Sequence, residues 1–252
     1  MGLTLDPAQA ATFVMASVRI LVFLLIAPPF AGAMVPGRVK VGMSVVLAMI
    51  VTPRMTETLA GVDTASVISG IVFQAAMGAA LGFIILILFS AVQAAGQLID
   101  FSAAFSSAAA FDPFSQASST PVARLYQMLA TLLLFSSGGY LLFIGGLLRS
   151  FDAAPMSGFD LGTVSATLTE GLANFFVAAL QIAAPLMAAL FMAELLLGLL
   201  AKAAPQMNLL VIGFGTKSLV VLGLGGMALM LLPRAVELIV DMALRGMAAI
   251  VG

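Results

Sequence analysis

The stretch FSAAFSSAAAFDPFSQASSTP, residues 101–121, separates two long apolar tracts near the middle of the chain. It contains one charged residue, Asp112, together with a run of Ser and Ala and three Phe beyond Phe101. It is too polar and broken for a membrane-spanning helix, and too apolar for an ordinary solvated loop. Irregular backbone at membrane depth persists only where protein or a water-filled cavity surrounds it. Two interpretations are therefore open, a plug or constriction that faces a lumen, and a plain hydrophobic connector.

The composition around this stretch excludes a soluble protein. Of the 252 residues, 62% are hydrophobic and only 8% are charged, and the mean hydropathy is +1.20. A soluble domain has about 25% charged residues, so a water-facing surface cannot be made from this set. We therefore expect an all-α, polytopic membrane protein that forms a single domain over residues 1–252.

The residue types also argue against catalysis. The chain has no Cys and no His, which excludes disulfides, thiol chemistry, Cys or His metal sites and His acid–base chemistry. Asp100 and Asp112 are the only neighbouring carboxylates in the middle, and Ser102, Ser106 and Ser107 have no His to act as a base. We expect no enzyme and no cofactor. The net charge of −1 and the lack of a basic run argue against nucleic-acid binding.

Proline and polar residues divide the chain into six apolar tracts. Pro7 is a plausible first helical residue, Pro28-Pro29 should break the first tract, and Pro233 should end the last. The second tract is shorter than the roughly 20 residues that span hydrocarbon. The N-terminus lacks a basic signal-peptide region, so the first tract should remain as a membrane segment. The expected tracts cover residues 10–34, 41–53, 67–95, 122–148, 172–200 and 209–232.

The connectors should include polar loops over 56–66 and 150–171 and a tight turn over 199–208. An amphipathic helix is expected over 235–252, because Glu237, Asp241 and Arg245 recur every four residues. The basic residues are equally divided between alternate connectors, so they do not indicate which side of the membrane is cytoplasmic. Connectors after the first, third and fifth tracts hold Arg38, Lys40, Arg124 and Lys202, and those after the second, fourth and sixth hold Arg54, Arg149, Arg234 and Arg245. This balance is unusual for helices that each cross a bilayer.

Three charged residues, Arg19, Glu194 and Lys217, lie inside apolar tracts. A charge at mid-bilayer costs about 2.5–3.5 kcal/mol on insertion scales, so such residues normally face protein or water. Arg19 and Lys217 could instead extend to the interface along their stems. Glu194 has the shortest reach, and we expect it to pair with a cation or polar backbone groups between helices or subunits. Lys202 lies eight residues after Glu194 on the same helix face.

Glycines mark possible close contacts between helices. Gly78 and Gly82 form a GxxxG pair, which permits close approach, although Gly is also common in membrane helices. Gly198 lies between Glu194 and Lys202 on one face and leaves room for a neighbouring backbone. We expect Leu at these three glycines to block assembly, and Ala to be tolerated.

Three groups of residues together resemble the FliR family of flagellar export-gate proteins, whose injectisome counterpart is the SctT family. The most specific is the third, and the match runs from about Arg19 to Pro233. Gly215, Lys202 and Glu194 depart mildly from the residues expected of that family. The groups are RILVFLLIAPPF and VPGRVK within 19–40; ALGF at 80–83, AAGQLID at 94–100 and FDP at 111–113; and APLMAALFMAELLLGLLAKAAPQMNLLVIGF at 184–214, followed by Lys217.

The resemblance implies a non-enzymatic subunit of the type III export gate, built of kinked helical hairpins. Such proteins assemble with FliP and FliQ in the bacterial inner membrane, at the flagellar basal body. FlhB and FlhA associate with this core, membrane lipid surrounds it, and unfolded flagellar proteins pass through it. The resemblance also favours the plug interpretation, which assigns the closed pore to Phe105, Ser106, Ser107, Phe111, Asp112, Pro113 and Phe114.

Three other classes remain as alternatives. One is a secondary transporter or channel with a re-entrant loop, but inverted repeats are expected there, and only Pro28-Pro29 and Pro185 correspond weakly. The second is a structural membrane scaffold, which would need no Phe-bearing loop. The third is the equivalent gate subunit of an injectisome.

Overall fold

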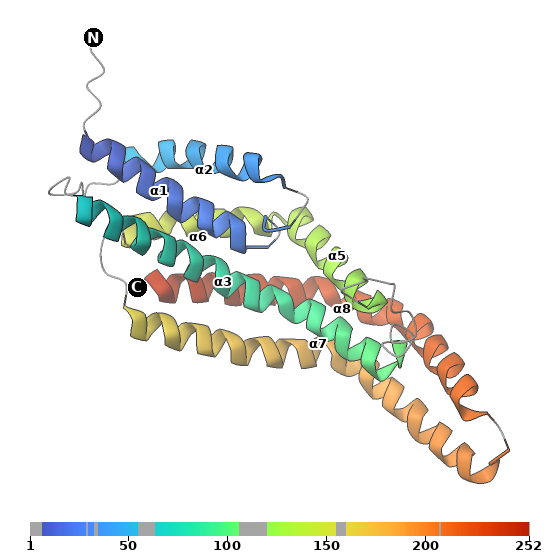
Figure 1. Ribbon diagram of the computed structural model, residues 1–252. Coiled ribbons are helices and arrows are strands. Elements are labelled where there is room, and N and C mark those ends of the chain that lie inside the picture. The colour runs from blue at the N-terminus through green and yellow to red at the C-terminus, as the bar shows by residue number, and fades with distance from the viewer. Residues whose placement is uncertain are drawn as a thin grey trace. The chain divides into compact units, whose positions relative to one another are not determined.

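The computed structural model is built of helices (Figure 1). It describes residues 7–28, 30–32, 35–54, 64–105, 120–154, 160–206 and 208–251, and no strand occurs within them. The elements are α1 (Pro7–Ile26), α2 (Gly37–Val51), the 3-10 turn η1 (Thr52–Arg54), α3 (Thr64–Ser102), α5 (Pro121–Ser136), α6 (Gly139–Ala153), α7 (Leu161–Ala203) and α8 (Leu209–Val251).

The predicted all-α membrane class is confirmed. Four described helices, α1, α3, α7 and α8, are long and apolar enough to cross a membrane, and α5 and α6 meet the same criterion only as a pair. With 15 residues, α2 is about 22 Å long, so it is too short to span the hydrocarbon, as predicted.

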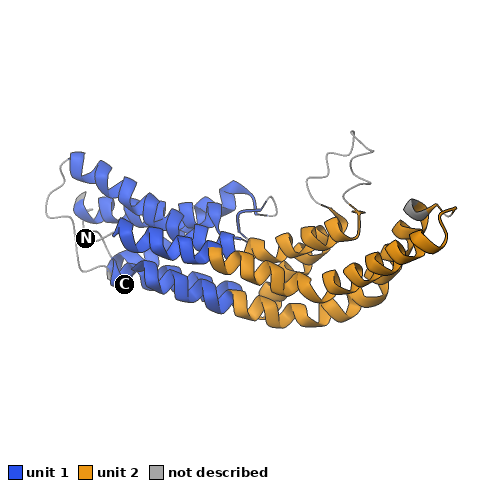
Figure 2. Cartoon of the chain, turned by 90° about the horizontal axis from the view of Figure 1, so that it is seen from below, with its two compact units in different colours: residues 1–88, 138–172, 240–252 blue, residues 89–137, 173–239 orange. Residues whose placement is uncertain are grey.

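The chain divides into two compact units (Figure 2). Unit 1 consists of residues 1–88, 138–172 and 240–252, and unit 2 of residues 89–137 and 173–239. Thus α1, α2 and α6 belong to unit 1, α5 belongs to unit 2, and α3, α7 and α8 each contribute to both units.

The core of unit 1 is built on helical spacing. On α1, Ile20, Phe23 and Leu24 are fully buried, on one stripe three to four residues apart. On α3 the stripe includes Leu81 and Ile84. Phe143, Leu147 and Phe151 continue the core from α6 at the same spacing.

Several predicted boundaries agree with the structure. Helix α1 begins at Pro7, where the absent N–H is no loss, and ends at Ile26 before Pro28. Helix α2 ends at Val51 and passes into η1, which contains Pro53. The last turn of α7 reaches Ala203, so only the second half of the expected 199–208 turn is non-helical.

Two predicted segments were wrong because a local backbone signal was missed. The 122–148 tract is not one helix, because Gly138 has φ +73°, a left-handed conformation that Gly adopts without a side-chain clash. The expected loop 150–171 is largely helical, because Asp160 caps α7 by accepting hydrogen bonds from the Gly162 and Thr163 N–H groups, each at 3.0 Å. The Thr163 hydroxyl also donates to Asp160, and these bonds hold the pKa of its carboxyl below the ordinary value.

The sequence also predicted the C-terminal ends of two helices, α3 and α8, too early in the chain. Helix α3 ends only at Ser102, so the start of the 101–121 stretch is helical, and Ala104, two residues later, has φ 63°. Helix α8 continues through Pro233, although Pro removes a backbone donor there. Leu232, Val236 and Ile239 of the same helix are buried on either side of this position, and neighbouring groups commonly compensate such breaks in membrane helices.

Candidate functional site

Arg19 lies fully buried inside unit 1, at the contact of three helices. Its Nε donates to Gln74 Oε1 on α3 at 2.5 Å. Its Nη1 donates to the Ser150 backbone oxygen at 2.9 Å and to Ser150 Oγ at 3.2 Å, and its Nη2 donates to the Ala154 backbone oxygen at 2.7 Å. The guanidinium carbon also lies 4.3 Å from the centre of the Phe151 ring.

This geometry explains how an arginine is tolerated inside an apolar tract. The last carbonyl groups of a helix have no intrahelical partner and carry partial negative charge. The guanidinium of Arg19 donates to two carbonyl oxygens at the end of α6, that of Ala154 and that of Ser150, which also accepts from the Ala154 N–H at 3.1 Å. Arg19 therefore joins α1 to α3 and α6 and does not extend to an interface along its stem.

Gly78 and Gly82 provide the close approach that places Arg19 there. A Cβ on Gly78 would lie closer than 3.0 Å to the Arg19 backbone oxygen, and one on Gly82 would lie 3.1 Å from Ile26 Cβ. The GxxxG pair is thus a contact between α3 and α1 and not a matter of composition. The expectation that Ala would be tolerated does not fit Gly78, because the overlapping atom belongs to backbone.

Asp100 forms a second buried junction, in unit 2. Its Oδ2 accepts hydrogen bonds from Thr120 Oγ1 at 2.5 Å and Ala123 N at 2.9 Å, and its Oδ1 accepts from Val122 N at 3.1 Å. The last turn of α3 thereby caps the free N–H groups at the start of α5. One turn earlier, a Cβ on Gly96 would lie closer than 3.0 Å to the Ala123 backbone.

Of the seven predicted plug residues, only Phe105 lies in the described part of the chain. Its ring meets that of Phe214 on α8 edge-to-face, with centroids 6.0 Å apart. The two rings belong to unit 2, like the Asp100 junction. The other six, Ser106, Ser107, Phe111, Asp112, Pro113 and Phe114, lie outside the described residues.

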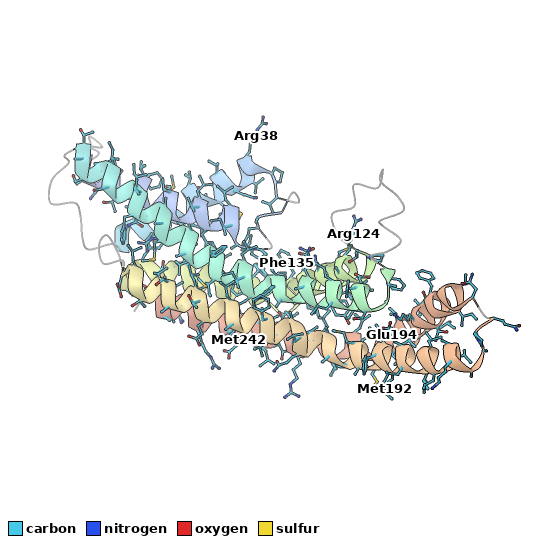
Figure 3. The ribbon with its side chains drawn as sticks, turned by 60° about the horizontal axis from the view of Figure 1, so that its bottom comes forward. Arg38, Arg124, Phe135, Met192, Glu194 and Met242 are labelled. Atoms are coloured by element: carbon cyan, nitrogen blue, oxygen red, sulfur yellow. The ribbon has the colours of Figure 1, made fainter. Side chains whose placement is uncertain are left out.

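Glu194 forms an ion pair between α7 and α8 (Figure 3). Lys217 Nζ lies 3.2 Å from Glu194 Oε2, and the side chains are 13% and 64% exposed, respectively. Glu194 is the solvent-exposed member of this pair and Lys217 is largely buried, so most of the carboxylate remains available to another partner. Lys202 is exposed near the end of α7.

Gly198 differs from the other two glycines. Nothing in the described part of the chain lies within 4 Å of a Cβ built on it. Room for a neighbouring backbone exists there, and no described residue of this chain fills it. The expected effect of Leu at Gly198 therefore depends on a second protein.

The sequence did not reveal Gln74 and Ser150 as partners of Arg19, or the cap formed by Asp100. Asp100 was considered only for catalysis, and because it lies 20 residues before Thr120, no local signal links it to the start of α5. Among the described residues, no group of three or more Asp or Glu could hold a metal ion.

Replacing Asp100 by Asn is expected to destabilise unit 2 by about 1–2 kcal/mol, because the buried amide has one acceptor oxygen where three donors converge. Amide hydrogen exchange at residues 122–124 should accelerate. Asp152→Asn, at an exposed position on α6, is the control. Equal exchange in both variants would exclude a capping role for Asp100.

Comparison with known proteins places this arrangement in a family. Residues 10–243 match the family described as bacterial export proteins, family 1. The chain is 31% identical over 170 residues to the flagellar biosynthetic protein FliR of Escherichia coli K12, covering 67% of this chain and 65% of that protein. It is 29% identical to FliR of Pectobacterium carotovorum, with 68% and 66% covered, and 27% identical to FliR of Bacillus subtilis, with 70% of each covered.

The matched segments thus span about two thirds of these relatives, 65% and 66% of the first two. The family match extends over nearly all of the described helices, from α1 into the last turns of α8. The apolar helices of this chain are those of a multi-pass membrane protein. This chain therefore belongs to the FliR family of bacterial export proteins.

Proposed function

We propose that this chain is a core subunit of the flagellar type III export gate and forms, with FliP and FliQ, the channel for unfolded flagellar proteins. The match of residues 10–243 to the export family is the observation that carries the proposal. FlhB and FlhA are further proposed partners, and the bacterial inner membrane at the flagellar basal body is the proposed location. The role is structural and requires no catalysis.

The length of the apolar helices supports the need for partner subunits. With 43 residues each, α7 and α8 are about 65 Å long, roughly twice the thickness of the hydrocarbon layer. Parts that extend beyond the hydrocarbon must be covered by protein, because large apolar surfaces are rarely left in water. In unit 2 the exposed apolar side chains include Met192, Leu196 and Leu199 on α7 and Leu222, Met227 and Met230 on α8.

Purification from native membranes tests this proposal. The tagged chain should be recovered with FliP and FliQ under mild detergent. Recovery of the chain alone or as a homo-oligomer, from cells in which FliP and FliQ are present, would contradict the gate assignment and favour a transporter.

Glu194→Ala should reduce recovery of FliP and FliQ more than Leu197→Ala. The intrachain pair with Lys217 is weak, because Glu194 is 64% exposed, so loss of this carboxylate should leave the chain itself folded. Leu197 packs within the chain, near the position of a Cβ on Gly213, at 3.6 Å. Equal recovery of partners from the two variants would show that Glu194 makes no intersubunit contact.

We also propose that the central loop plugs the closed channel. Hydrophobic constrictions exclude water and ions, and Phe105, Phe111 and Phe114 supply apolar bulk. Asp100 before the loop bonds Val122 and Ala123 after it, and Phe105 contacts Phe214 on α8. These contacts would hold the two ends of the loop in fixed positions.

Deletion of residues 106–112 should preserve assembly with FliP and FliQ but raise ion leak across the membrane and slow growth. The measurement is membrane conductance in cells in which the assembled complex is verified. Normal conductance would refute the plug, whereas loss of assembly would identify the loop as a wedge between subunits.

A further inference from the structure

A half-open groove lies within unit 1, between α6 and the last turns of α8. Its volume is about 360 Å³, within the range of small-ligand sites. Its walls are apolar along most of their length. They include Leu141, Leu142 and Gly145 on α6 and Leu244, Met247 and Val251 on α8.

A single cation, Arg149, lines this groove. It is exposed, and within the described residues it has no hydrogen bond or ion pair, even with Asp152 three residues later. Gly145 lies one turn before Arg149 on the same helix face, and nothing lies within 4 Å of a Cβ built on it. The groove is therefore open beside the unpaired guanidinium.

Arg149 also marks one end of the groove. Ala153 at the end of α6 and Val251 at the end of α8 line the same groove, and both helices end on the same side of unit 1 (Figure 1). Arg149 is about one turn from Ala153, whereas Leu141 and Leu142 lie about three turns from Ala153. The groove is thus apolar along its length and cationic near the helix ends.

We propose that this groove binds an anionic phospholipid, with an acyl chain along α6 and α8 and the phosphate on Arg149. Helix α8 is long and apolar enough for a membrane span, and α6 is so together with α5, so a membrane lipid is the ligand class that these helices favour. Arginine binds phosphate oxygens in a bidentate, charge-assisted manner. This proposal depends on the membrane character of the chain and is independent of the export function.

The chemistry of the lining favours a lipid as the occupant. One cation, Arg149, stands beside a groove whose other walls are mostly apolar, and this pattern complements a ligand with one anionic group and a hydrocarbon chain.

Native mass spectrometry of the chain, or of its complex, in detergent tests the proposal with added phosphatidylglycerol and phosphatidylethanolamine. Arg149→Gln should retain about fivefold less phosphatidylglycerol and should lose less phosphatidylethanolamine, because the ammonium group of that lipid already offsets part of its phosphate charge. Arg234→Gln, at an exposed position outside the groove, should behave like the parent protein. Gly145→Leu should fill the groove and reduce retention of both lipids, whereas Gly223→Leu, also in open space, should not.

Unchanged phosphatidylglycerol retention in Arg149→Gln would overturn the proposal. Displacement of the lipid by excess soluble glycerol phosphate would do the same, because it would identify a site for free anions. A photoreactive residue in place of the exposed Leu141 should cross-link to lipid in native membranes. A polypeptide adduct would instead show that a partner protein occupies the groove.

Discussion

Replacing Arg19 by methionine is expected to destabilise the protein by about 3 kcal/mol or more. Methionine fills much of the space but donates no hydrogen bond, so the bonds from Arg19 to Gln74 and to the backbone oxygens of Ser150 and Ala154 are lost inside the protein. A hydrogen bond to a charged group contributes about 1.5–3 kcal/mol, and several are lost together. The midpoint of thermal unfolding in detergent should fall by about 6 °C or more.

Two further variants separate the hydrogen bonds from the charge. Arg19→Lys keeps the charge but cannot reach the three acceptor groups with a planar fork, so its stability should be intermediate. Arg38→Met removes an exposed arginine that points away from unit 1 and should leave the melting midpoint nearly unchanged (Figure 3). If Arg19→Met melted at the same temperature as Arg38→Met, the proposed joint between α1, α3 and α6 would not exist.

Gly78→Ala is expected to lower stability by about 1–3 kcal/mol, the usual cost of overpacking. The added methyl group would overlap the backbone oxygen of Arg19. Helix α1 cannot retreat freely, because the Arg19 side chain is fixed to α3 and α6. The intrinsic helix preference of Ala over Gly, about 1 kcal/mol, acts in the opposite direction, so a measured loss reports the clash.

The same substitution elsewhere provides the control. Gly42→Ala on α2 adds a methyl group to open space and should keep or raise the melting midpoint. Gly82→Ala should fall between the two, because its nearest atoms lie at 3.1–3.3 Å. An equal melting midpoint for Gly78→Ala and Gly42→Ala would show that the contact between α3 and α1 is looser than described here.

Local chemistry was readable from the sequence where one residue decides the backbone. The start of α1 at Pro7 and its end before Pro28 follow from proline geometry, and the GxxxG pair indicated a close helix contact. Gly138 and Asp160 were equally local signals, a glycine before a new helix and a cap before Leu161, but they were masked by surrounding apolar or polar composition.

The partners of the buried polar residues could not be predicted in this way. Gln74, Ser150 and Ala154 lie 55, 131 and 135 residues from Arg19 along the chain. Hydrophobic periodicity shows which face of a helix is buried but not which helix covers it. The predicted helix end at Pro233 was wrong, because α8 continues through this proline and tertiary context can override a local preference.

The interleaved makeup of unit 1 determines when it can mature during synthesis. Its helices come from three separated parts of the chain, and the last part begins at residue 240. The side chain of Ile84 on α3 is so close to Gly171 and Gly246 that a Cβ on either glycine would lie within 3.0 Å of it. The face of α3 around Ile84 therefore remains uncovered after that helix is synthesised, until the final turns of α8 leave the ribosome.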